Sequence, residues 1–113
     1  ANCKLMEAKV WSDPKILKRL QENFVIVALY VDDRTELPES EWFPSKLDGK
    51  IKKTIGKQNE DLEISMFNTN ALPLYVITDS EGKPLTKPMT TNFNIEEYAQ
   101  WLDEGYQKFR GSI

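Results

Sequence analysis

The amino-acid sequence predicts an α/β fold, in which helices and strands alternate along a short chain. Residues 24–31 form a continuous apolar run rich in β-branched residues, which is typical of a strand covered on both faces. A proline opens a second apolar run at residues 71–78, and apolar residues recur at helical spacing over residues 95–109. The predicted order of elements is therefore helix, strand, helix, strand, strand, helix.

Two consecutive helices are predicted in the first 22 residues. Asn2 is suited to cap the first helix because its side-chain oxygen can accept a hydrogen bond from an orphan backbone amide. This places Cys3 in the first turn. The helix should break before Pro14, because a proline pushes the residue before it out of the helical region. Asp13 then caps a second helix with Pro14 at its first position, continuing to Glu22.

The centre of the chain is predicted to be largely irregular, with one small hairpin. The Asp-Gly pair at residues 48–49 is a good signal for a tight hairpin turn. Trp42 and Phe43 precede it, and they either cover the edge of the core or form an exposed docking patch. A helix is then expected from residue 58 or 59 to about residue 67. Its inward-facing residues are expected to be Leu62, Met66 and Phe67.

The last third of the chain predicts a hairpin followed by a long helix. The turn at residues 79–82 contains a glycine and leads into an edge strand, because Pro84 and Pro88 cannot donate ladder hydrogen bonds. Asn94, with Glu97 three residues later, resembles a capping box at the start of the helix. The aromatic side chains of this helix, and Trp11 at the other end of the chain, are expected to pack in the core.

Composition excludes several classes of function. The chain has 113 residues, 40% hydrophobic and 29% charged, which suits a single globular domain. Its net charge of -3 disfavours nucleic acid, since phosphate binding needs a clustered basic surface. It has no histidine, which removes His-ligated metals and Ser-His-Asp triads, and no apolar run near the roughly 20 residues of a membrane span. We therefore expect no nucleic-acid partner, no metal and no cofactor.

The single cysteine, Cys3, has two possible interpretations. In the first turn of a helix the backbone dipole favours a thiolate, as it does at redox cysteines. A lone cysteine is also often a small buried hydrophobe with no reactivity. The residue types alone leave both interpretations open.

The N-terminal segment resembles a known active-site pattern. Residues Asn2 to Glu7, followed by Trp11 to Pro14, are similar to the second half of the active-site segment in bacterial thiol:disulfide interchange proteins of the DsbD type, in their C-terminal thioredoxin-like domain. In that family the pattern is Cys-x-x-Cys-Lys-x-x-Glu, then an aromatic residue, then Ser-Asp-Pro. Cys3 matches the second, resolving cysteine. Glu7 matches the acidic residue that lies beside the disulfide.

The resemblance implies a thioredoxin-like three-layer sandwich, with a mixed sheet flanked by helices. Residues 1–113 would form a single domain of this kind, excised from a longer protein. The resemblance also implies that Pro73 is cis, and that Leu72 before it faces the cysteines and offers backbone hydrogen bonds to the substrate. The first, attacking cysteine would lie three residues before Cys3, outside the sequence.

The resemblance further implies a protein-disulfide reductase domain, in which Cys3 resolves a mixed disulfide and Glu7 tunes proton transfer. Its expected partners are periplasmic thiol and disulfide proteins and a membrane electron-donor domain. The resemblance thus places the domain in the periplasm and implies a role in cytochrome c biogenesis. The alternative is a thioredoxin-like interaction module without redox turnover. In that case Cys3 is inert and the loop at Trp42 and Phe43 docks a partner.

The implied sheet leaves one strand position open. In a thioredoxin sheet, the strand that leads into the cysteines lies between the two strands assigned here to residues 24–31 and 74–78, and it would precede Ala1. An empty position would leave backbone amides unpaired on both sides, each at a cost of roughly 1–3 kcal/mol. We therefore expect upstream residues to supply this strand. In the chain alone, either the two strands pair directly or another chain fills the slot, so self-association is expected to be possible.

Overall fold

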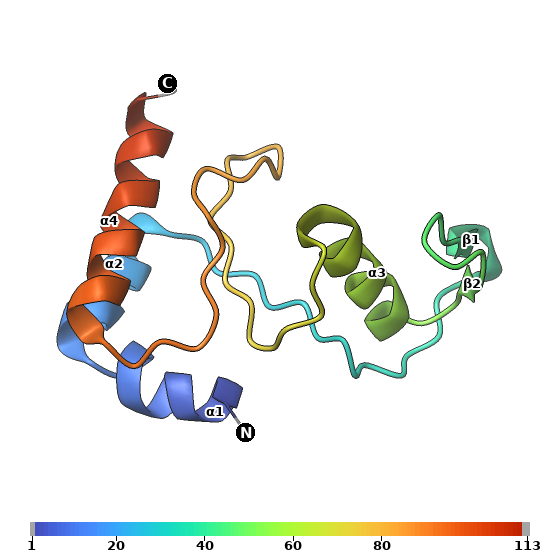
Figure 1. Ribbon diagram of the computed structural model, residues 1–113, viewed down its shortest axis with the longest axis horizontal. Coiled ribbons are helices and arrows are strands. Elements are labelled where there is room, and N and C mark those ends of the chain that lie inside the picture. Colours follow the sequence, from blue (N-terminus) through green and yellow to red (C-terminus); the bar gives the residue numbers. More distant parts are fainter. Residues whose placement is uncertain (1, 112–113) are drawn as a thin grey trace. The chain divides into compact units, whose positions relative to one another are not determined.

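The computed structural model describes residues 2–111, so Ala1 lies outside the described part of the chain. These residues divide into two compact units: residues 2–26 with 71–111, and residues 27–70 (Figure 1). The elements of the first unit are α1 (Asn2–Met6), the π-helical turn η1 (Glu7–Trp11), α2 (Pro14–Asn23) and α4 (Ile95–Gly111). Those of the second are the 3-10 turn η2 (Glu39–Glu41), β1 (Phe43–Pro44), β2 (Ile51–Lys52) and α3 (Ile55–Phe67).

The two predicted N-terminal helices are confirmed. α1 begins at Asn2, which therefore lies within the helix rather than at its cap, and it continues without a break into η1. The side chain of Asp13 accepts a hydrogen bond from the backbone amide of Lys15, and Pro14 is the first residue of α2. The capping signal of Asp13 and Pro14 thus places the start of α2 correctly.

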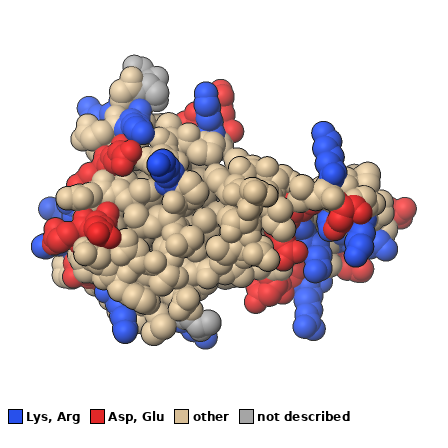
Figure 2. Space-filling view, viewed as in Figure 1, with Lys and Arg blue, Asp and Glu red and all other residues tan. Residues whose placement is uncertain are grey.

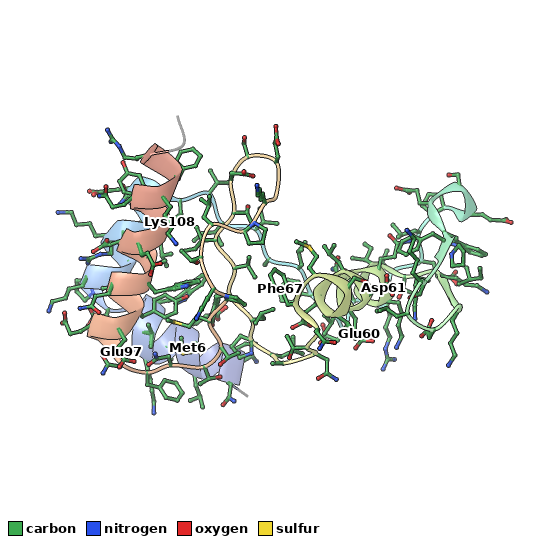
Figure 3. The ribbon with its side chains drawn as sticks, turned by 45° about the horizontal axis from the view of Figure 1, so that its top comes forward. Met6, Glu60, Asp61, Phe67, Glu97 and Lys108 are labelled. Carbon is green, nitrogen blue, oxygen red and sulfur yellow. The ribbon has the colours of Figure 1, made fainter. Side chains whose placement is uncertain are left out.

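The core of the first unit lies between these helices and α4. α2 packs beside α4 (Figure 1), and Met6 points from α1 into the cluster of side chains between them (Figure 3). Tyr98, the largest fully buried side chain, contacts the rings of Tyr75 and Trp101 at centroid distances of 5.6 and 5.4 Å. The buried set is Met6, Val10, Ile16, Leu20, Ile77, Tyr98, Ala99, Trp101 and Leu102. The expectation that the aromatic residues of the last helix pack in the core is therefore confirmed for Tyr98 and wrong for Phe109, which is 38% exposed.

The predicted C-terminal hairpin forms, but with isolated bridges in place of continuous strands. Tyr75 pairs with Met89 and Thr78 pairs with Pro84, both antiparallel. Gly82 in the turn has a φ of 84°, a conformation that suits glycine. The prolines that follow have no N–H to donate, which limits the ladder to these short contacts.

The start of α4 uses half of the predicted capping box. The side chain of Asn94 accepts a hydrogen bond from the backbone amide of Glu97, as predicted. The carboxylate of Glu97 accepts a hydrogen bond from the side chain of Asn92 instead of reaching back to the amide of Asn94. The amide of Asn94 is satisfied by the side chain of Asn92.

The second unit contains the small hairpin expected at the Asp-Gly pair, but residues 45–50 connect its strands in place of a two-residue turn. β1 and β2 are antiparallel, with Phe43 opposite Lys52 and Pro44 opposite Ile51. The indole of Trp42 is half-buried and donates a hydrogen bond to the carbonyl of Leu37. Trp42 therefore packs locally, whereas Phe43 is 38% exposed.

α3 starts earlier than predicted, and two side chains that were predicted to face inward are exposed. Thr54 caps it by accepting a hydrogen bond from the amide of Lys57, so the helix begins at residue 55 rather than 58 or 59. It ends at Phe67 as predicted, where Asn68 takes the left-handed conformation with a φ of 54°. The inward orientation predicted for Leu62 and Met66 is wrong, because these side chains are 46% and 45% exposed.

The central strand predicted over residues 24–31 is not formed. Its backbone makes no backbone hydrogen bond within the described residues, and Val25 and Val27 are 94% and 74% exposed. The backbone bonds of residues 75–79 go to residues 83–89, so the two segments do not pair directly with each other. A strand needs a neighbour, and the described chain supplies none. Helices with a small antiparallel sheet fit an α/β fold, but the mixed sheet of a three-layer sandwich is not seen among residues 2–111.

Candidate functional site

Cys3 and Glu7 are exposed on the first helical segment of the chain. They are four residues apart, so their side chains lie on the same side of the helix. Met6 and Val10 lie three residues after Cys3 and Glu7 and are fully buried, so Cys3 and Glu7 lie at the edge of the buried face, with their own side chains exposed. The interpretation of Cys3 as a buried hydrophobe is therefore wrong. Its thiol is free and accessible.

The second part of the predicted site is the peptide between Leu72 and Pro73. This peptide bond is cis, as predicted. The side chain of Leu72 is 53% exposed, whereas Pro73 is buried. The surface at Leu72 is therefore accessible to a binding partner.

The charges of Cys3 and Glu7 affect the pKa of Tyr75, which lies two residues after Pro73. The pKa of its hydroxyl is raised to about 12, mainly because the group is partly buried, and further because Cys3 and Glu7 carry negative charge nearby when ionised. A charge raises a tyrosine pKa only when it is close. The structure therefore brings Cys3 and Glu7 within electrostatic range of the segment that follows Pro73.

Tyr75 is held in place by an aromatic cluster. Its ring lies 5.8 Å from that of Trp11 and 5.6 Å from that of Tyr98, in tilted and edge-on arrangements that aromatic pairs prefer. Sequence reasoning missed Tyr75 as a site residue. Tyr75 could have been predicted from the geometry of an extended chain, in which successive side chains point to opposite sides. Tyr75 lies two residues after Pro73 and is therefore expected on the same side.

The arrangement suits thiol chemistry more than other chemistries. An accessible thiol beside a carboxylate can attack a disulfide and exchange a proton with its neighbour. Within residues 2–111, no cluster of three or more cysteine, aspartate or glutamate side chains is placed to hold a metal ion. In the same range, no helix is long and apolar enough to cross a membrane.

Comparison with known proteins agrees with this geometry. No curated protein matches the chain. A family model described as a thioredoxin-like domain matches residues 1–106, which is almost the whole sequence. The chain therefore belongs to the thioredoxin-like domain family.

Proposed function

We propose that the chain acts in thiol-disulfide exchange, as part of a protein-disulfide reductase domain of the DsbD type. Membership of the thioredoxin-like family supports a redox or disulfide-related function. The observation that carries the proposal is the exposed thiol of Cys3, one helical turn from the carboxylate of Glu7. A cysteine that only fills space in the core would be buried, and it would not need a carboxylate beside it.

In the proposed mechanism Cys3 is the resolving cysteine. An attacking cysteine, proposed to lie three residues before it, first attacks the partner's disulfide as a thiolate; the S–S bond breaks, one partner sulfur leaves as a thiolate and the other forms a mixed disulfide with the attacking cysteine. The thiolate of Cys3 then attacks the sulfur of that attacking cysteine, which forms an internal disulfide and releases the partner's sulfur as a thiolate. The pair of cysteines is oxidised by two electrons and the partner's disulfide is reduced. Glu7 accepts the proton that the thiol of Cys3 loses.

Leu72 and Pro73 are proposed to bind the partner chain. Leu72 is exposed, so its backbone amide and carbonyl can pair with an extended segment that carries the partner's disulfide. The partners proposed are periplasmic thiol and disulfide proteins, with a membrane domain as the electron donor. This would place the domain in the periplasm and in cytochrome c biogenesis.

The three-layer sandwich with a mixed sheet is proposed to form when a further strand is added. Residues 24–31 keep the apolar composition of a central strand and are largely exposed. A strand from upstream residues, or from a second copy of the chain, would satisfy their backbone and cover their side chains. Self-association is thus proposed for the chain when it is alone.

A second candidate function is a thioredoxin-like interaction module without redox turnover. One observation favours it: Phe43, in the loop that this alternative expects to dock a partner, is 38% exposed. In this case Cys3 would be accessible but not used.

Reaction of Cys3 with a small disulfide separates the two candidates. We expect 5,5′-dithiobis(2-nitrobenzoate) to form a mixed disulfide with Cys3 faster than with a free cysteine peptide, and Glu7→Gln to change the dependence of this rate on pH. Glu22→Gln, the same change at an exposed position on α2, is the matched control. If Cys3 reacts no faster than the peptide and Glu7→Gln leaves the pH dependence unchanged, the interaction module is the better description.

A further inference from the structure

The hairpin of residues 43–53, named here the lysine hairpin, exposes apolar side chains around its turn. Leu47 in the turn is 52% exposed and Ile51 in β2 is 48% exposed. Pro44 lies opposite Ile51, and residues directly opposite each other in an antiparallel pair share one face of the sheet. The hairpin therefore presents an apolar surface that the rest of its unit does not cover.

The lysine hairpin is well ordered by hydrogen bonds, so this exposure is not that of a loose loop. Asp48 accepts a hydrogen bond from the amide of Lys50. Gly49 has a φ of 74°, as the tight turn requires. Ser45 is buried and its hydroxyl is hydrogen-bonded to the carboxylate of Asp61 on α3. The side-chain amide of Gln58 donates hydrogen bonds to two backbone carbonyls, of Glu41 and Lys52.

The charge of the lysine hairpin is opposite to that of the whole chain. Residues 43–53 contain four lysines and one aspartate, although the chain carries a net charge of -3. Figure 2 shows lysine side chains reaching outward from the part of the molecule that holds β1 and β2, with acidic groups between them. The acidic residues Glu39 and Glu41 precede β1 and therefore lie at the end of the hairpin opposite its turn.

Two of the four lysines have partners and two do not. Lys52 is paired with Asp48 at 2.9 Å, and the ammonium group of Lys53 lies 4.8 Å from the ring centre of Trp42. Lys46 and Lys50, on either side of the turn, are exposed and make no ion pair with any described residue. The turn thus carries net positive charge next to exposed apolar groups.

We propose that the lysine hairpin docks on an anionic lipid surface. In this arrangement Leu47 and Ile51 enter the headgroup region, and Lys46 and Lys50 pair with lipid phosphates. The exposed apolar side chains of the hairpin are few, whereas a stable protein interface buries roughly 800 Å² per partner. Attraction to anionic lipid, by contrast, accumulates lysine by lysine, and short apolar side chains add to it. This inference does not depend on the chemistry of Cys3.

Co-sedimentation with vesicles tests the proposal. We expect the chain to bind vesicles of phosphatidylcholine mixed with phosphatidylglycerol, not to bind phosphatidylcholine alone, and to be released by added salt. Reversing both charges with Lys46→Glu and Lys50→Glu should weaken binding at least about tenfold. Lys18→Glu, an exposed lysine on α2, makes the same kind of charge change elsewhere and should weaken binding much less.

A second pair of variants tests the apolar contribution. Leu47→Ser should weaken binding, whereas Leu17→Ser, which changes a side chain that is 42% exposed on α2, should not. Circular dichroism confirms that each variant is folded, and Cys3→Ser should bind like the wild type. The proposal is overturned if anionic vesicles are not bound, if the control variants lose as much binding, or if phosphatidylcholine is bound equally well. Binding to immobilised poly-glutamate but not to vesicles would indicate an acidic protein partner instead.

Discussion

The indole nitrogen of Trp11 donates a hydrogen bond to the hydroxyl of Tyr98 at 3.1 Å, although the two residues are 87 positions apart in the chain. Tyr98 is 1% exposed and lies in the first turn of α4, so this bond joins the end of the first helical segment to the start of α4 inside the core. Trp11 also contacts the ring of Tyr75. The same bond therefore helps to fix the position of Tyr75 near Cys3 and Glu7.

Removing the Tyr98 hydroxyl should destabilise the protein. In Tyr98→Phe the ring still fills the core, but the partly buried N–H of Trp11 loses its acceptor, at an expected cost of about 1–3 kcal/mol. Urea unfolding measures the change. Tyr30→Phe removes an equivalent hydroxyl from a side chain that is 65% exposed and should have little effect. Equal unfolding midpoints for Tyr98→Phe and the wild type would show that the bond is not important for stability.

Tyr75 should make the folded state less stable at alkaline pH. Its pKa is about 12 in the folded chain, above its ordinary value near 10, because burial and nearby negative charge disfavour the phenolate. Its contribution to stability is therefore complete below pH 10 and is lost as the pH rises through 12. Urea unfolding of Tyr75→Phe should show a smaller loss between these values than the wild type. An identical loss in both proteins would mean that Tyr75 is not shielded as described.

Gly105 on α4 is expected to tolerate no side chain. A Cβ at this position would lie 2.5 Å from Cδ1 and 2.8 Å from Cγ2 of Ile77. Gly105→Ala should therefore cost about 1–3 kcal/mol of stability through overpacking, in spite of the better helix propensity of alanine. Gly111→Ala, where a Cβ meets nothing within 4 Å, is the control. If thermal unfolding shows Gly105→Ala to be as stable as the wild type, the contact with Ile77 is looser than described.

Much of the helical structure could be predicted from local signals. Asp13 with Pro14 places the start of α2, and Asn94 places the start of α4, because caps act on amides only two or three residues away. The Asp-Gly turn likewise predicts the small hairpin. These features need no information from distant parts of the chain.

The sheet and the aromatic cluster could not be predicted in the same way. Residues 24–31 have the composition of a central strand, but strand formation depends on a neighbour, which the described chain does not supply. Composition alone also could not show that Tyr75 would contact Trp11 and Tyr98, since this depends on tertiary packing. For the site, Cys3, Glu7, Leu72 and Pro73 were chosen through resemblance. The structure confirms the cis bond before Pro73 and adds the exposure of Cys3, Glu7 and Leu72 and the contribution of Tyr75.

The exposed segment of residues 24–31 should make the chain self-associate. Val27 is 74% exposed, and Val27→Lys places a charge in the surface that a second copy would cover. Light scattering should show the mass of the wild type rising with concentration and that of Val27→Lys staying at the monomer. Leu62→Lys, at an exposed position on α3, should behave like the wild type. A wild type that stays monomeric at all concentrations would contradict the proposed self-association.

Reduction of insulin by the chain and by a longer version is the most direct test of the redox account. A single thiol can form a mixed disulfide but cannot resolve it within the same molecule, so pre-reduced residues 1–113, mixed with insulin and no other thiol, should not complete the reduction of an insulin disulfide. A pre-reduced version extended upstream, with a cysteine three residues before Cys3, should complete it, and Cys3→Ser in that version should accumulate the mixed disulfide. Complete reduction by the chain alone, or by the extended version without Cys3, would contradict the resolving role of Cys3.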